Sequence, residues 1–91
     1  MGTKTVKYNK EGISLLPKDK PVLYRILTEA GTLNYAGVSQ RGQVQERIKQ
    51  HLDNIPGTKV QIEQFHSIND AKKKEANVIK KNQPKYNEKD K

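Results

Sequence analysis

The sequence predicts an α+β fold in which a small, largely antiparallel three-stranded sheet is flanked by helices. Two β-rich segments follow each other over a short turn, an amphipathic helical pattern comes next, and a third β-rich segment precedes a second helical pattern. The 91 residues suit one small domain and leave no room for a second core. A single domain is therefore expected to carry the whole function.

The first predicted elements form a hairpin. Residues 1–20 contain five Lys, two acidic residues and two Gly, and predict an irregular basic lead-in. Residues 22–28 are β-branched and aromatic and follow Pro21, so they predict a strand. Gly31 supplies the turn, and residues 33–38 predict a second strand that returns antiparallel to the first. The predicted domain spans residues 21–87, and residues 88–91 form a polar tail.

The second half of the chain predicts a helix, a strand and another helix. Within residues 42–52, Val44, Ile48 and Leu52 recur every four residues, which is typical of an amphipathic helix. Apolar and polar residues alternate within residues 59–65 well enough to predict a third strand. Ser67, with an acidic residue three positions later, resembles a capping box that opens a helix over residues 68–82, and Pro84 ends it.

Composition favours a polyanionic partner. Eighteen Lys and Arg against ten Asp and Glu give a net charge of +8, and residues 72–91 alone contain eight Lys and three acidic residues. Nucleic acid is the leading partner, although a Lys-rich surface that only keeps the protein soluble is about as common. There is no Cys, so disulfides and thiol catalysis are excluded. No apolar run is long enough to cross a membrane or to act as a secretory signal, and we expect a cytoplasmic protein.

One residue of the last helix does not fit its surroundings. The stripe expected to face the core contains Ala71, Glu75, Val78, Ile79 and Asn82, so Glu75 occupies an apolar position. A carboxylate there loses hydration unless it is paired, protonated or bound to a cation. Glu75 is therefore a candidate ligand for a cation. Pairing with a neighbouring lysine at the edge of the stripe is an equally common alternative.

Other polar side chains suit phosphate chemistry. Arg47 and His51 are four residues apart and lie on one side of a helix, where Arg can hold phosphate oxygens and His can move a proton near neutral pH. Tyr24 and Tyr35 lie on the two strands of the hairpin. Taken singly, each is more often a half-buried strand residue than a catalytic group. Gly37 marks a bulge or a close approach of the backbone.

The order of these residues resembles the motifs of the GIY-YIG nucleases. Residues 22–24 and 35–37, Val-Leu-Tyr and Tyr-Ala-Gly, keep the two Tyr and the Gly of the paired motif that names the family. Arg47 and His51 match its Arg-x-x-x-His helix, and the chain continues with the Glu helix and a closing Pro-x-x-Asn. The interval between Gly37 and Arg47 is slightly longer than usual, which leaves Arg41 as a lesser candidate for the phosphate-binding Arg.

The resemblance implies an endonuclease that hydrolyses phosphodiester bonds of DNA with one divalent cation, Mg²⁺ or Mn²⁺. Glu75 would be its only protein ligand. Tyr24 or Tyr35 would orient or deprotonate the attacking water, Arg47 would stabilise the transition state, and His51 would assist proton transfer. Asn87 would hold the site by hydrogen bonding. Gly37 and five lysines are further candidates for contacts with nucleic acid: Lys72, Lys73, Lys74, Lys80 and Lys81.

Two other functions are compatible with the sequence. The chain could be a non-catalytic nucleic-acid-binding module on the same fold, or a small basic RNA-associated protein unrelated to nucleases. Members of the family take their targets from appended domains, as in the DNA-repair excinucleases and the homing endonucleases. The chain could be a free-standing enzyme or a fragment of a larger nuclease, and in either case a separate domain or protein could supply specificity.

Overall fold

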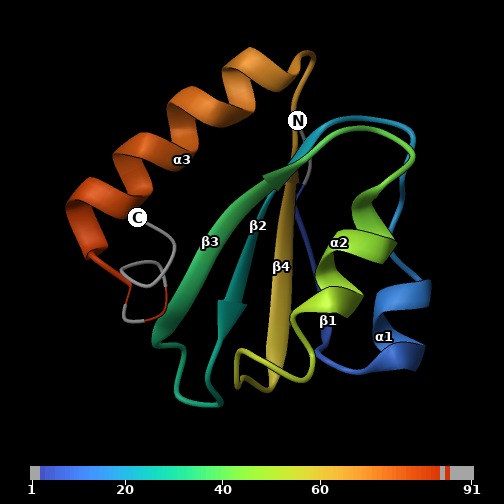
Figure 1. Ribbon diagram of the computed structural model, residues 1–91, viewed down its shortest axis with the longest axis vertical. Helices are drawn as coiled ribbons and strands as arrows, with labels where there is room; N and C mark the ends of the chain where they lie inside the picture. The colour runs from blue at the N-terminus through green and yellow to red at the C-terminus, as the bar shows by residue number, and fades with distance from the viewer. Residues whose placement is uncertain (1–2, 85, 87–91) are drawn as a thin grey trace.

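The computed structural model describes residues 3–84 and 86, which form a four-stranded antiparallel sheet with helices on both faces (Figure 1). The strand order is β1-β4-β2-β3. The α+β class predicted from the sequence is confirmed, but the predicted count of three strands is wrong. In chain order the elements are β1 (Thr3–Lys7), α1 (Lys10–Ser14), β2 (Val22–Leu27), β3 (Leu33–Ser39), α2 (Val44–Gln50), β4 (Lys59–Gln64) and α3 (Ile68–Asn82).

The fourth strand lies in the segment that was expected to be irregular. β1 pairs antiparallel with β4, with Val6 opposite Val60. After it, the Asn9 side chain accepts a hydrogen bond from the Gly12 amide and caps α1, whose Ile13 is fully buried. The irregular lead-in is therefore a wrong prediction for these residues. An edge strand with a single partly buried residue, Val6, lacks the apolar alternation that marks a strand in a sequence.

The hairpin and the third predicted strand are confirmed within one or two residues. β2 lies between β3 and β4 and pairs with both. Gly31 has a φ of +91°, which a residue with a side chain rarely adopts, and its amide donates to the Thr28 carbonyl in the turn between β2 and β3. β2 is therefore the central strand on which any site carried by the hairpin is built.

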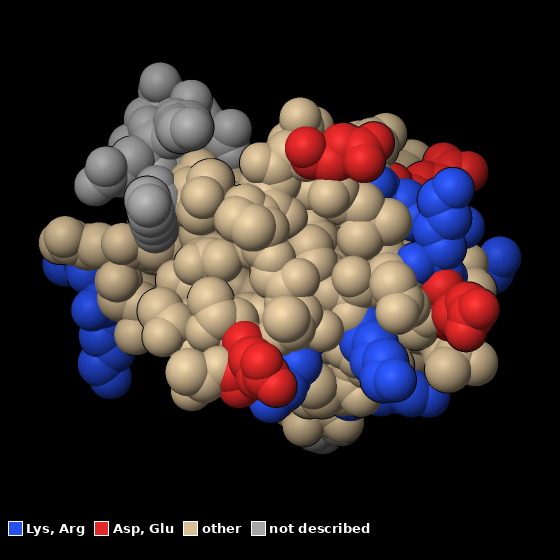
Figure 2. Space-filling view, turned by 90° about the horizontal axis from the view of Figure 1, so that it is seen from below, with Lys and Arg blue, Asp and Glu red and all other residues tan. Residues whose placement is uncertain are grey.

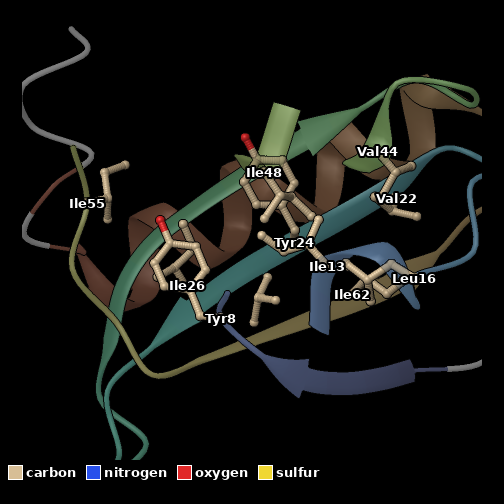
Figure 3. Close-up of a cluster of buried hydrophobic side chains, with 11 residues drawn as sticks. Tyr8, Ile13, Leu16, Val22, Tyr24, Ile26, Val44, Ile48, Ile55 and Ile62 are labelled. Atoms are coloured by element: carbon tan, nitrogen blue, oxygen red, sulfur yellow. The ribbon is translucent and has the colours of Figure 1, made fainter. Parts of the chain in front are cut away.

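The larger core lies between the sheet and the pair α1 and α2. Val44 and Ile48 of α2 are fully buried there, as the helical spacing predicts, and Leu52 packs at the margin. Figure 3 shows Tyr24 of β2 beside Ile48 within this cluster. Full burial of an aliphatic side chain of this size contributes roughly 1.5–3 kcal/mol. α2 is thus held firmly against the face of β2 from which Tyr24 projects.

The smaller core lies on the other face, under α3. The Ser67 side chain accepts from the Asp70 amide and caps the helix, which spans residues 68–82 as predicted. Ala71 and Val78 are buried against residues of the sheet, and Glu75 lies half-buried on the same stripe. Asn82 is exposed, so its predicted place on the stripe is wrong. Among the described helices, none is long and apolar enough to cross a membrane.

Candidate active site

Tyr24 is the centre of a polar cluster on the α2 side of the sheet. Its side chain is 1% exposed, and its hydroxyl oxygen lies 2.8 Å from Nε2 of His51. His51 is the C-cap residue of α2, whose position is fixed by the burial of Val44 and Ile48. The hydrogen bond therefore joins two residues whose backbones are each anchored in the larger core.

Tyr35 completes an aromatic group with these two residues. Its ring centroid lies 6.1 Å from that of Tyr24 and 4.7 Å from that of His51. Tyr35 is half-buried and lies on the edge strand β3, opposite Ile26 of β2. The structure thus brings together three of the side chains that the sequence marked for chemistry, and of the two Tyr residues Tyr35 is the more accessible to water.

Gly37 lies opposite Tyr24 and makes room for its ring. A Cβ atom at Gly37 would come within 2.7 Å of both Cζ and the hydroxyl oxygen of Tyr24, and within 3.0 Å of the Tyr35 ring. The register of β2 and β3 is regular at this point, so Gly37 is a site of close approach and not a bulge. Gly37 is buried, and its contribution here is to position the Tyr24 and Tyr35 rings.

Burial controls the ionisation of Tyr24. Desolvation raises its pKa well above the usual value, and the nearby Tyr35 and Glu75 raise it further through charge repulsion. A hydrogen bond to Tyr35 also favours the protonated form, whereas the positive charge of Arg47 lowers the pKa. Arg47 of α2 and Glu75 of α3 therefore both lie close enough to act on Tyr24, although the two helices pack on opposite faces of the sheet.

Glu75 is a carboxylate in partial isolation from water. Desolvation raises its pKa, and Lys72, one helical turn earlier, lowers it. The only ion pair between side chains of residues 3–84 and 86 is Arg25–Glu63, so the lysine near Glu75 does not form a close pair with it. Lys74, which directly precedes Glu75 in the chain, lines a hollow with Arg25 instead. A desolvated carboxylate of this kind favours a cation as its partner.

A hollow beside the cluster offers room for an anion. It has a volume of about 290 Å³ and is lined by Arg47, Lys72, Gln43, Ser39 and Gln40, among others. Both of its charged lining residues are cations. Gln43 was not singled out from the sequence, although it precedes Arg47 by four residues, the spacing that places two side chains on one side of a helix.

The remaining predicted residues lie elsewhere. Arg41 lines a neighbouring hollow with Lys20, Asp19 and His66, which shares Gln40 and Ile68 with the hollow that Arg47 lines. Of the two candidate arginines, Arg47 is the one that affects the pKa of Tyr24. The described lysines of α3 are all exposed. Asn87 lies outside the described residues. Nearby, Pro84 is buried and the Tyr86 amide donates to the Asn34 carbonyl of β3, so the chain returns to the edge strand after α3.

The donor set limits what kind of metal site is possible. No group of three or more His, Asp or Glu side chains that could hold a metal ion occurs within the described part of the chain. A single carboxylate suits Mg²⁺, which keeps most of its water ligands and binds proteins through one or two carboxylates. In comparisons with known proteins, no family model and no curated protein matched the chain.

Proposed function

We propose that this chain is a metal-dependent endonuclease of the GIY-YIG type that hydrolyses phosphodiester bonds of DNA. The observation that carries the proposal is the direct contact of Tyr24, Tyr35 and His51, which come from β2, β3 and the end of α2. Each side chain alone has an ordinary structural explanation. Their convergence near Arg47, together with their order in the chain, fits the family motif and supports the proposal.

Tyr35 is the better of the two Tyr residues for activating water. Tyr24 is almost fully buried and its pKa is raised, so it keeps its proton. The hydrogen bond with Tyr35 also favours the protonated form of Tyr24, so we take Tyr24 as the donor and Tyr35 as the acceptor. Because a hydroxyl has one proton, the Nε2–H of His51 would donate to the Tyr24 oxygen. Tyr35 thus serves as the base, and Tyr24 and His51 hold its orientation.

Arg47 supplies the charge needed at the phosphate. Its guanidinium lines the hollow of about 290 Å³ beside the cluster, together with Lys72. An Arg can hold two phosphate oxygens at once, and it stabilises negative charge as it develops in the transition state. Lys72 would hold the neighbouring phosphate of the same strand.

Glu75 fits the role of the single protein ligand to Mg²⁺ or Mn²⁺. Its carboxylate is half-buried and desolvated, and it is near enough to Tyr24 to change the pKa of that phenol. Glu75 would hold a divalent cation there, which would supply positive charge and activated water to the reaction. The role of metal ligand, which the family resemblance gives to Glu75, would explain why a carboxylate occupies an otherwise apolar stripe.

The test is incubation of the protein with supercoiled, branched and single-stranded DNA, with and without Mg²⁺. We expect cleavage only with the cation, and a large loss of cleavage in Tyr35→Phe. Tyr8→Phe is a matched control, because Tyr8 is also buried in the larger core but lies outside the polar cluster. Failure of the wild-type protein to cut any of these DNA forms with Mg²⁺ or Mn²⁺ would exclude the proposed activity.

One observation favours a second function, that of a non-catalytic nucleic-acid-binding module on the same fold. Desolvation raises the pKa of Glu75, so a proton competes with a metal ion for this carboxylate more strongly than for an exposed one. The same experiment separates the two functions. A binding module would retain DNA in a mobility-shift assay without cutting it, whether or not Mg²⁺ is present.

A further inference from the structure

We propose that a second, non-catalytic nucleic-acid site lies on the side of α3 that faces away from Glu75. It is a hollow of about 730 Å³ between α3 and the sheet, here called the basic hollow, and its charged and amide lining residues are Arg25, Lys74, Asn77, Lys80, Lys81 and Asn82. Within residues 3–84 and 86, no carboxylate lines it. The sequence singled out three of its lysines but not Arg25.

Helical geometry separates the basic hollow from the candidate active site. α3 buries Ala71 and Val78 against the sheet, and residues on either side of this stripe point to different flanks. Glu75 and Lys72 lie on the flank that faces the active site. Lys74 and Lys81 are seven residues apart, two helical turns, and lie on the other flank. One helix therefore contributes cations to two distinct surfaces.

The sheet forms the floor of the basic hollow. The face of the sheet that does so is the α3 face, opposite to the one from which Tyr24 projects. Neighbouring residues of a strand project to opposite faces, so Arg25 points toward α3 while Tyr24 points toward α2. Nη2 of Arg25 donates to a Glu63 carboxylate oxygen at 3.4 Å, a long contact that holds the guanidinium in place. Glu63 offsets one of the positive charges, and the lysines of α3 remain to attract an anion.

The chemistry of the lining fits the sugar–phosphate backbone of a polynucleotide. Four cations and two Asn side chains can contact several phosphate groups in a row, and the described lining contains no aromatic side chain that could stack on a base. Binding there would therefore be independent of sequence. Other parts of the surface lack such a cluster of cations. Figure 2 shows the end of the molecule that carries the β2–β3 turn, where acidic and basic side chains are interspersed on a largely uncharged surface.

The inference rests on the proposed function for the identity of the polyanion, but it does not require cleavage. The basic hollow would hold a segment of the nucleic acid away from the bond that is cut, and so contribute to affinity and not to the chemical step. Removing its cations should raise the Kd and KM for DNA and leave kcat unchanged.

The test measures binding without cleavage, by fluorescence anisotropy of a short labelled DNA duplex in EDTA over a range of salt concentrations. The test variant is Lys74→Ala/Lys81→Ala. The matched control is Lys4→Ala/Lys10→Ala, which removes the same charge from exposed residues of β1 and α1. Loss of two phosphate contacts should reduce the slope of log Kobs against log salt by about 2, and the control should leave the slope unchanged.

The outcomes separate this inference from the proposed nuclease activity. A reduced slope in the test variant supports the basic hollow even if the wild-type protein never cuts DNA. Equal slopes in the test and control variants would overturn it, even if cleavage depends on Tyr35 and Arg47. A labelled polyglutamate peptide is the third arm. If the test variant loses affinity for this peptide but not for DNA, the site binds acidic protein and the inference is wrong.

Discussion

The hydroxyl of Tyr24 and the Nε2 atom of His51 lie 2.8 Å apart, although 27 residues separate them in the chain. This hydrogen bond connects the α2 face of the sheet to the end of α2. A substitution at either residue should therefore alter the position of the other side chain. A polar contact so close to a packed core has consequences for both stability and chemistry, and several of them can be measured.

The first prediction concerns Tyr24→Phe. The change removes a buried hydroxyl with hydrogen-bonding partners, and we expect unfolding to be easier by roughly 0.5–1.5 kcal/mol with the fold retained. DNA cleavage should fall, because His51 and Tyr35 lose the group that orients them. Denaturant unfolding and a cleavage assay measure the two effects. Tyr8→Phe is the control, since the Tyr8 hydroxyl has no hydrogen-bond partner among the described residues. Equal loss of stability in both variants would contradict the prediction.

The second prediction concerns Gly37→Ala. The new methyl group would come within 2.7 Å of the Tyr24 ring and hydroxyl, so the ring must shift. We expect a loss of about 1–3 kcal/mol in unfolding free energy, the usual cost of overpacking. The His51 imidazole resonances in an NMR spectrum should move as its hydrogen bond to Tyr24 is disturbed. In a Tyr24→Phe background, Gly37→Ala should cost less unfolding free energy, because the close contact with the Tyr24 hydroxyl oxygen is gone and only the one with the ring remains. An unchanged cost there would mean that the hydroxyl is not the atom displaced.

The third prediction compares two arginines. Arg47 lies close enough to Tyr24 to lower the pKa of its phenol and lines the hollow beside the cluster, whereas Arg41 lines a different hollow. We expect Arg47→Ala to reduce kcat by roughly 10²–10³, the usual effect of removing a group that stabilises transition-state charge. Arg41→Ala removes the same charge and should leave kcat near the wild-type value. The reverse order of effects would assign the phosphate to Arg41.

The fourth prediction concerns Glu75→Gln, which keeps the size of the side chain and removes its charge. Cleavage with Mg²⁺ should be abolished. A carboxyl group whose pKa is raised on folding destabilises the folded state when it is ionised, so the cost is present at neutral pH and absent once both states are protonated. Without metal, the variant should therefore be as stable as the wild type or more stable at pH 7. This difference should vanish below about pH 4, near the unperturbed Glu pKa.

Glu46→Gln is the matched control for this fourth prediction, because Glu46 is an exposed carboxylate on α2. Thermal unfolding at the two pH values measures the effect. If Glu75→Gln cut DNA at the wild-type rate with Mg²⁺, or if it failed to fold, the carboxylate would be a structural ion-pair residue and not a metal ligand.

Much of the fold could be predicted because local signals agree with the tertiary structure. The Ser67 cap and the apolar stripe through Ala71 and Val78 fix α3 to its observed bounds. β1 could not be predicted, because an edge strand is stabilised by its pairing with β4 and only Val6 is partly buried. α1 had a readable signal in the Asn9 cap and in the spacing of Ile13 and Leu16, but Gly12 obscured it.

The residues of the candidate site could be predicted from the sequence, but their contacts with one another could not. The sequence identified Tyr24, Tyr35 and His51 as separate candidates, because their residue types and order are visible in it. Their mutual contacts depend on the packing of α2 against β2, which no local pattern encodes. Arg25 was missed for a related reason. Its place in the basic hollow depends on α3 crossing the opposite face of the sheet.

The strand order β1-β4-β2-β3 has a consequence for how the protein folds. β4 is the last of the described strands but lies between β1 and β2, so Thr3 must pair with Glu63 before the sheet is complete. Contacts of such high sequence separation slow folding, and a chain emerging from the ribosome cannot make them until β4 has been synthesised. The hairpin that carries Tyr24 and Tyr35 therefore lacks a neighbouring strand until β4 has been synthesised. We therefore expect the cluster of Tyr24, Tyr35 and His51 to become rigid only after β4 has paired with β2, although β4 contributes no residue to the cluster.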